Sequence, residues 1–330
     1  MRIPILIPFI FLLLMMSCQQ EPITFQKVMV SETDPDQLYI NDDNSTSLYY
    51  LKYVPKTQIK GALIVLPSGG ERTEDVIQQI NLHVLAAKQD LITIIPSLNW
   101  GVDNRLADYQ FLDQIFNEII ETYQVPKDKF VLGGLSNGGM VSIGYAQKSV
   151  KHPNSTAVKP LGIFGLDTPL DKAYLYAYCK REIERNFSQA GVNEAKWMLN
   201  NYQKLYGGSP EDFPEKYIEA SLYSYGVKNG GNAYYLKNMP IRMYTDLDVD
   251  WLMNERQRDL NDWNGSDIIA MINALKIMGN PNAHVNVTMG KGIRLDGRKH
   301  PHSWSIMDNN DCMDWILSLM QNELENEYVL

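Results

Sequence analysis

The sequence predicts an α/β fold in which a mostly parallel central sheet is flanked by helices and carries a helical cap insertion. Three observations predict it. Short continuous apolar runs recur along the chain, helical patterns alternate with these runs, and one segment between two of them is too long to be a loop. Apolar residues make up 45% and charged residues 21% of the 330 residues, which are proportions typical of a globular protein.

The first residues differ in composition from the rest of the chain. One charge at Arg2 is followed by an apolar run over residues 3–16, which is too short to span a bilayer and typical of a secretory signal. Ser17 and Cys18 close the run and resemble a bacterial lipobox. This resemblance implies a signal peptide over residues 1–17, lipidation of Cys18, and anchoring in the bacterial cell envelope, facing the periplasm or the surface. A plain cleaved secretory signal and a buried helix are the alternatives.

The next segments predict the order of strands and helices. Residues 18–46 are polar and suit a tether that leads into one folded domain over residues 47–330. Alternating patterns at residues 24–28 and 47–51 predict antiparallel edge strands. Continuous apolar runs predict strands buried on both faces, at residues 62–66, 91–95, 130–132, 161–166, 241–244 and 284–288. Apolar residues at helical spacing predict helices at residues 74–89, 109–123, 140–147 and 306–323. This alternation predicts parallel strands joined by right-handed crossovers.

The segment at residues 167–239 is the predicted cap. It is rich in tyrosine and charged residues, and we expect several helices in it. Its aromatic side chains suggest stacking on sugar rings or aromatic acyl groups, although such faces more often pack on a core.

Charge and cysteine content limit the possible partners. The net charge of −9 disfavours a nucleic-acid partner, because no basic stripe is present to release counterions from phosphates. Three cysteines are too few for a disulfide framework. Cys179 and Cys312 could pair or remain two buried thiols, and the sequence leaves both possibilities open. No metal-ligand spacing, phosphate loop or dinucleotide fingerprint occurs, so we expect no cofactor and no metal.

One motif points to chemistry. Gly134, Ser136 and Gly138 form a G-x-S-x-G pattern between a predicted buried strand and a predicted helix. Such a pattern places the serine on a sharp turn, where a side chain at either glycine would collide with the neighbouring strand and helix. The helix N-terminus also directs backbone N–H groups at the reaction centre. Ser136 is therefore the candidate nucleophile.

An activated serine needs a histidine base. His83, His152 and His284 fall within or beside predicted elements and suit structural or solvated roles. His300 and His302 lie in the loop between the last strand and the last helix, from which a base can reach the carboxyl edge of the sheet. We favour His302, because the residue before a proline, here His300, is held extended.

The base needs an orienting carboxylate, and four aspartates compete for this role. Asp246, Asp248 and Asp250 follow the strand at residues 241–244. We favour Asp248, since the acid normally lies a few residues past the end of a strand, and we place Asp167, at the end of the preceding strand, last. Calcium binding is an alternative use of this acidic turn, although the glycine and terminal glutamate of a regular calcium loop are absent.

The chain order Ser136, Asp248, His302 is that of an α/β-hydrolase. The sequence resembles an α/β-hydrolase-fold serine hydrolase of the secreted bacterial esterase type over about residues 60–325. The resemblance implies an oxyanion hole made by the backbone N–H of Asn137 and a second donor from Ser68, Gly69 or Gly70. Asn137 and Trp304 could line the pocket, and packing of the final helix against the sheet is an equal alternative for Trp304.

These observations favour an esterase that acts on small-molecule or glycan esters through an acyl-enzyme. A peptidase of the prolyl-oligopeptidase type is one alternative, and it would need acidic residues that capture a substrate amine. A non-catalytic glycan-binding lipoprotein is another.

Overall fold

The structure is a computed structural model that describes residues 23–30, 39–40, 46–98 and 106–326. The predicted signal peptide, the predicted lipidation site Cys18 and most of the predicted tether lie outside these ranges. Within the described ranges, no helix combines the length and the apolar character that a bilayer crossing requires.

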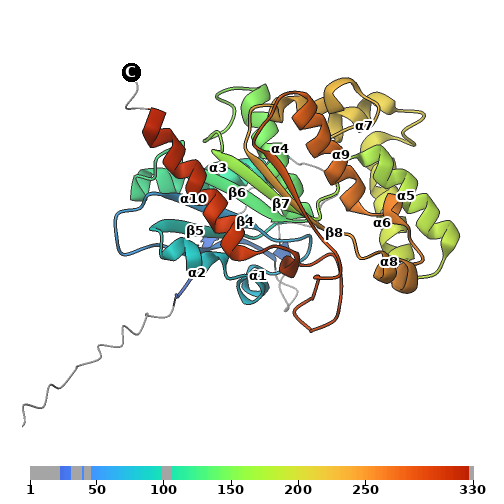
Figure 1. Cartoon of the computed structure of the whole chain (residues 1–330), viewed down its shortest axis with the longest axis horizontal. Helices are drawn as coiled ribbons and strands as arrows, with labels where there is room; N and C mark the ends of the chain where they lie inside the picture. The colour runs from blue at the N-terminus through green and yellow to red at the C-terminus, as the bar shows by residue number, and fades with distance from the viewer. Residues whose placement is uncertain (1–22, 31–38, 41–45, 99–105, 327–330) are drawn as a thin grey trace, which may run out of the picture.

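A single sheet runs through the molecule (Figure 1). Its strands lie side by side in the order β1 (Gln26–Val30), β3 (Thr46–Tyr53), β5 (Leu91–Pro96), β4 (Gly61–Leu66), β6 (Phe130–Leu135), β7 (Gly162–Leu166), β8 (Ile241–Asp246) and β9 (Ala283–Thr288), with the short β2 (Tyr39–Ile40) paired to β3. The pairs of β1 with β3 and of β3 with β5 are antiparallel. All pairs from β5 to β9 are parallel, which confirms the predicted mostly parallel sheet.

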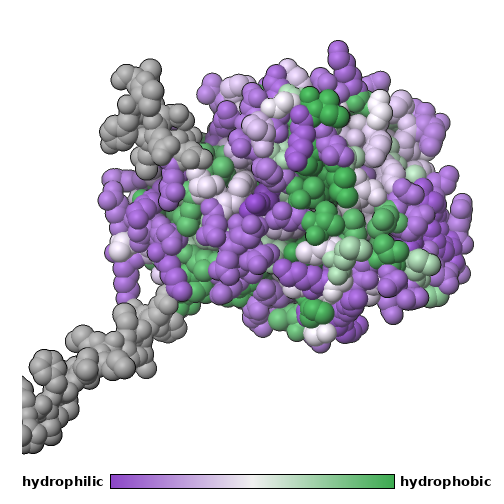
Figure 2. Space-filling view, in the orientation of Figure 1, coloured by the Kyte–Doolittle hydropathy of each residue, from purple (hydrophilic) through white to green (hydrophobic). Residues whose placement is uncertain are grey.

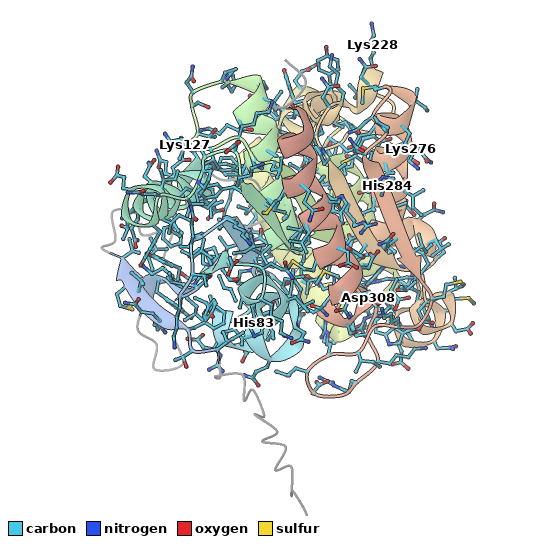
Figure 3. The ribbon with its side chains drawn as sticks, turned by 60° about the vertical axis from the view of Figure 1, so that its left-hand side comes forward. His83, Lys127, Lys228, Lys276, His284 and Asp308 are labelled. Atoms are coloured by element: carbon cyan, nitrogen blue, oxygen red, sulfur yellow. The ribbon has the colours of Figure 1, made fainter. Side chains whose placement is uncertain are left out.

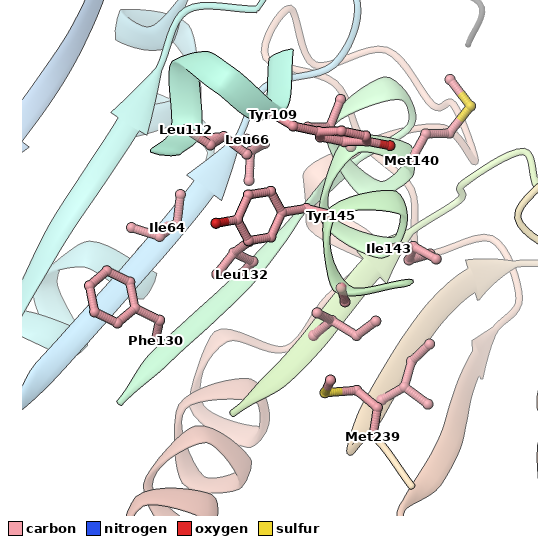
Figure 4. Packing of buried hydrophobic residues seen from close by; sticks show 14 of the residues in the cluster. Ile64, Leu66, Tyr109, Leu112, Phe130, Leu132, Met140, Ile143, Tyr145 and Met239 are labelled. Carbon is pink, nitrogen blue, oxygen red and sulfur yellow. The ribbon is translucent and has the colours of Figure 1, made fainter. Parts of the chain in front are cut away.

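Helices cover both faces of this sheet. One face packs against α3 (Leu106–Tyr123), α4 (Asn137–Lys151) and α9 (Asn264–Ile277), and the other against α1 (Thr73–Gln79), α2 (Leu82–Ala87) and α10 (Asn309–Asn326). Along β4, Ile64 belongs to the first core and Leu63 to the second. Figure 4 shows part of the first core, where Ile64 and Leu132 face Tyr145 of α4. Because both faces are buried, each central strand reads as a continuous apolar run.

The first crossover differs from the prediction. The apolar spacing over residues 74–89 predicted one helix, but the structure has two, α1 and α2, separated at Ile80 and Asn81. Ile80 has an extended backbone, with φ −118° and ψ 156°. The backbone N–H of Asn81 donates to Oδ1 of Asn309 at the start of α10, over 3.0 Å. A contact with a distant segment therefore accompanies the break, and local spacing could not reveal it.

Several helices lie between β7 and β8, as the cap prediction expected. They are α5 (Lys172–Arg185), α6 (Gln189–Tyr206), α7 (Pro214–Ala220) and the 3-10 segment η2 (Lys228–Leu236). Figure 1 shows α5 and α6 beside α8 (Val249–Arg256) at one end of the sheet. The rings of Tyr202, Tyr206 and Tyr217 pack together, with the Tyr206 and Tyr217 centroids 4.6 Å apart. These tyrosines are buried, so they stabilise the cap and do not form a platform for sugars.

Hydrophilic side chains form most of the border of the face drawn in Figure 2, and hydrophobic ones gather toward its middle. The large exposed apolar side chains include Ile277 at the end of α9 and Val287 on β9. Two short 3-10 turns, η3 (Leu260–Asp262) and η4 (Trp304–Ile306), complete the described fold.

Candidate active site

Ser136 lies on the sharp turn between β6 and α4. Its backbone has φ 55° and ψ −114°, in the region that side chains rarely adopt. The backbone N–H of Ser136 donates to the Leu166 carbonyl over 2.9 Å. A Cβ built on Gly134 would lie 2.4 Å from the Leu66 carbonyl oxygen, and one on Gly138 would lie 2.1 Å from the same oxygen. The close approach that the motif predicted at both glycines is therefore present.

His302 contacts the carboxylate of Asp167. Its Nδ1 lies 2.6 Å from Oδ2 of Asp167, whose side chain is fully buried. Burial raises the pKa of Asp167, while the contact with His302 acts in the opposite direction. The side-chain amide of Asn264 donates to the Asp167 backbone oxygen over 2.9 Å. A carboxylate that accepts from Nδ1 fixes the ring tautomer, so that Nε2 is the nitrogen able to accept a proton.

The expectation that Asp248 holds His302 is wrong in this geometry. Asp248 is the N-cap of α8, where its Oδ1 accepts from the Trp251 backbone N–H over 3.1 Å. Its Oδ2 lies 2.6 Å from Nζ of Lys299. The physical reason is local: the chain turns into a helix at residue 249, whereas the prediction assumed an extended segment there.

The other two aspartates after β8 also have different surroundings. Asp246 is fully buried, and its two carboxylate oxygens accept the backbone N–H groups of Gly290 and Gly292 over 2.6 and 2.7 Å. It therefore holds the start of the loop that carries His302. Asp250 lies exposed in the first turn of α8.

Sheet order is the signal that would have identified Asp167. Asp167 directly follows β7, and β7 pairs with β6, the strand that carries Ser136. Leu135 pairs with Leu166, so Ser136 and Asp167 leave adjacent strands at the same level of the sheet. The strand that precedes Asp248 lies one position farther from β6.

Two cavities meet at His302. The first has a volume of about 280 Å³ and is lined by Ser136, His302 and His300 together with cap and α8–α9 residues. The second, of about 480 Å³, is lined by Ser68, Gly69 and Gly70 on the other side of His302. These volumes lie at the lower end of the range for small-molecule sites. His302 therefore borders both the cavity that Ser136 lines and the cavity that the predicted oxyanion loop lines.

His300 supports the loop from within the first cavity. Its Nδ1 accepts the backbone N–H of His302 over 3.1 Å, and its ring lies 4.4 Å from that of Trp251. Burial, followed by nearby positive charges led by Arg294, lowers the pKa of His300 to about 2. A neutral His300 is thus a hydrogen-bond acceptor for the loop, which agrees with the preference for His302 as base.

The predicted oxyanion loop is held by Glu71. The carboxylate of Glu71 accepts the Ser68 backbone N–H over 2.9 Å, the Gln79 side-chain amide over 2.7 Å and the Trp304 indole N–H over 3.0 Å. Burial raises the pKa of Glu71, and these donors oppose the rise. Since the Ser68 N–H is directed at Glu71, Gly69 and Gly70 remain the candidates for the second donor. Asn137 supplies the first N–H of α4, directly after Ser136.

Neither Asn137 nor Trp304 lines the two cavities. Both side chains are buried, and Trp304 packs in the core between the sheet and α10. Trp304 instead links the loop that carries His302 to Glu71.

The remaining histidines lie on other elements. Figure 3 shows His83 and His284 far apart, on α2 and on β9. His83 is buried beside Phe25, and burial lowers its pKa. His152 is exposed at the end of α4. None of the three lines the two cavities at His302.

Cys179 and Cys312 are both buried free thiols, and burial raises the pKa of each to about 12. The structure therefore has two thiols where the sequence left a disulfide open. Over the described ranges, no group of three or more His, Cys, Asp or Glu residues is arranged to hold a metal ion.

Neither a protein-family model nor a curated protein matches the chain, whereas solved structures do. The chain is similar to carboxyl esterase 2 from the fungus Tuber melanosporum, with 14% identity and a TM-score of 0.52 over 93% of this chain and 89% of that one. It is also similar to acylaminoacyl peptidase from Pyrococcus horikoshii, with 15% identity and a TM-score of 0.50 over 90% of this chain and 41% of that one.

A puromycin hydrolase is similar as well, with 13% identity and a TM-score of 0.50 over 91% of this chain and 39% of that one. The chain thus spans about two fifths of the length of the peptidase and of the puromycin hydrolase. Together with the sheet order, these likenesses show that the chain has the α/β-hydrolase fold that the sequence resemblance implied.

Proposed function

We propose that the protein is a serine hydrolase that cleaves carboxylic esters through an acyl-enzyme. The observation that carries the proposal is the 2.6 Å contact between His302 Nδ1 and the buried Asp167, beside a serine on a positive-φ turn. Nucleophile, base and orienting carboxylate are the three groups that this chemistry needs.

In the proposed reaction, Ser136 Oγ attacks the ester carbonyl while His302 Nε2 takes the hydroxyl proton. The Asp167 carboxylate accepts Nδ1–H and stabilises the imidazolium that forms. The N–H of Asn137 and one N–H of the Gly69–Gly70 pair bind the oxyanion. Such a donor typically contributes about 3–4 kcal/mol to transition-state stabilisation. His302 then returns the proton to the leaving alcohol, and water, activated by the same histidine, releases the acid and regenerates Ser136.

A fluorophosphonate probe tests the catalytic claim, because it labels only an activated serine. Wild type should become labelled and Ser136→Ala should not. The circular dichroism spectra of the two proteins should coincide, which shows that the variant is folded. A folded wild type that resists labelling would contradict the proposal and favour the non-catalytic interpretation.

Chromogenic substrates separate esterase from peptidase. We expect turnover of p-nitrophenyl acetate or butyrate and little turnover of aminoacyl p-nitroanilides.

The peptidase alternative needs a carboxylate that captures an amine. Of the acidic residues that line the first cavity, Asp262 is already paired with Arg181 and Arg185. Burial, with the nearby Asp171 charge, raises the pKa of Asp267 to about 8, so this side chain is mostly protonated at pH 7. Glu194 is the remaining acidic residue of this lining, so the peptidase alternative would have to use it to capture the amine.

A further inference from the structure

Three arginine side chains line the cavity beside Ser136, and two of them form no ion pair with a carboxylate of the described residues. Arg256, Arg258 and Arg294 all border it. Arg258 is buried, and its Nε lies 2.9 Å from the Glu182 carboxylate. Arg256 contacts neutral groups: it donates to the Ser188 hydroxyl over 3.3 Å and lies over the Trp251 ring at 5.0 Å. Among residues 23–30, 39–40, 46–98 and 106–326, no carboxylate lies within 4.0 Å of the guanidinium nitrogens of Arg256 or Arg294.

The acidic residues of the same cavity do not cancel this charge. Asp262 is engaged by two other arginines, with its Oδ1 2.6 Å from Nε of Arg181. Asp267 is buried and mostly protonated, for the reason given above. Glu194 is the remaining acidic residue of the lining, and it is exposed. Arg256 and Arg294 thus border the first cavity together with one carboxylate that has no ion pair of its own within the described residues, Glu194, while Asp296 of the second cavity also acts on Arg294.

Arg294 places a positive charge close to the proposed reaction centre. Arg294 borders both cavities that meet at His302. A group held there is close to the ester that Ser136 would attack. A guanidinium presents parallel N–H donors that match the two oxygens of a carboxylate. The same positive charges disfavour a cationic substrate group.

We propose that the substrate is an anionic ester, whose carboxylate binds Arg256 and Arg294 while its ester carbonyl lies at Ser136. This inference rests on the proposed esterase function and names its substrate class. The carboxylate belongs to the acyl part or to the alcohol part of the ester, and the experiment distinguishes these two sources.

Two matched substrate pairs measure the preference. The first pair is mono-(4-nitrophenyl) adipate and its methyl ester, which places the charge on the acyl part. The second is 4-acetoxybenzoate and its methyl ester, which places it on the leaving alcohol. For each pair, the quantity is the ratio of kcat/KM for the anionic ester to that for the neutral ester. In wild type we expect a ratio of about ten to one hundred for one of the pairs, the size of a charge-assisted hydrogen bond.

Variants then assign the preference to residues. Arg256→Gln and Arg294→Gln should each lower the ratio about tenfold, because each removes one cation from the carboxylate. Arg298→Gln is the matched control on the same loop, since the Arg298 side chain is 78% exposed, pairs with Asp296 and borders neither cavity. It should leave the ratio within about twofold.

Two failures can be told apart. If wild type hydrolyses the neutral esters in a Ser136-dependent manner but shows no anionic preference in either pair, the substrate inference is overturned and the esterase stands. A preference that survives in the Arg256→Gln, Arg294→Gln double variant overturns it equally. If wild type hydrolyses no ester and resists the fluorophosphonate, the proposed function falls and the inference falls with it.

Discussion

At the scale of single residues, Asp167 has a backbone that few side chains adopt. Its φ is 38°, and its N–H donates to the Tyr244 carbonyl over 2.8 Å. The carboxylate of Asp167 is thereby fixed between β7 and β8, in reach of His302. Strained backbone at a functional position is typical of a group that must be held in one place.

Asp167→Asn should lower kcat for p-nitrophenyl acetate by about 10⁴-fold, because a neutral amide does not stabilise the imidazolium and its NH2 group can face Nδ1, which leaves the wrong histidine tautomer. Asp248→Asn is the matched control, and we expect a change of less than about tenfold, since Asp248 contacts Lys299 and the start of α8. Steady-state kinetics on the two variants check this. If Asp248→Asn lowered kcat more than Asp167→Asn does, Asp248 and not Asp167 would be the carboxylate that orients His302.

Asp267 makes stability depend on pH. Its pKa is raised to about 8 in the folded protein, mainly by burial, whereas the pKa of an aspartate in an unfolded chain is about 3.9. Between these values the folded state binds more protons than the unfolded state. The contribution of Asp267 to stability is therefore full below about pH 4 and is lost as the pH rises toward 8.

Asp267→Asn removes this titration and keeps an oxygen that can accept the Asp171 backbone N–H, which lies 3.2 Å from Asp267 Oδ2. The melting temperature of the variant minus that of wild type should therefore increase from pH 5 to pH 8. Differential scanning fluorimetry across this range measures it. A difference that stays constant with pH would show that Asp267 is ionised in the folded protein throughout.

At the scale of elements, the turn from β6 into α4 depends on contact between two backbones. Gly138 lies against the end of β4, with no space for a Cβ beside the Leu66 carbonyl. A backbone atom cannot move aside as a flexible side chain can, so β6, α4 and β4 are fixed relative to one another. The same contact fixes Ser136 against the loop that follows β4.

Gly138→Ala should lower the free energy of unfolding by more than about 3 kcal/mol, because the methyl group forces β4 and α4 apart. Gly226→Ala is the matched control. Its φ is +72° and nothing lies within 4 Å of an added Cβ, so only backbone strain of about 1–2 kcal/mol is expected. Urea unfolding followed by tryptophan fluorescence compares the two. Equal losses would show that the close approach to Leu66 is not what requires Gly138.

At the scale of the whole molecule, buried polar contacts connect the cap to the sheet layer. The Gln147 side-chain amide of α4 donates to the Leu222 carbonyl over 2.7 Å. Asp171, the N-cap of α5, receives three backbone N–H groups, and its own N–H donates to Asp267 of α9. We therefore expect the cap and the sheet to unfold together.

The two buried thiols report on this cooperativity, since Cys179 lies in α5 of the cap and Cys312 in α10 against the sheet. Neither should react with iodoacetamide in the native protein, and both should become alkylated at the same urea concentration. Peptide mapping by mass spectrometry resolves the two sites. Alkylation of Cys179 at a clearly lower urea concentration would show that the cap unfolds on its own.

Much of the fold follows from local pattern, and the site follows only in part. The elbow at Ser136 is encoded within a few residues, and the central strands are marked by continuous apolar runs. Asp167 is different, because its role depends on which strands are neighbours in the sheet. The break between α1 and α2 likewise involves Asn309, far along the chain. Lipid anchoring at Cys18 stays a prediction from the sequence.

The pairing of β6 with β7 has a consequence for protein design. Ser136 and Asp167 belong to one contiguous β6–α4–β7 unit, and the Ser136 N–H bonds the end of β7 directly. Two of the three proposed catalytic groups could therefore be transplanted together, provided that the new scaffold also supplies the contacts that Tyr244 of β8 makes with Asp167 and that Leu66 of β4 makes with the turn at Ser136. The turn after β8 is then available for redesign, provided that Asp246 continues to hold the loop that presents His302.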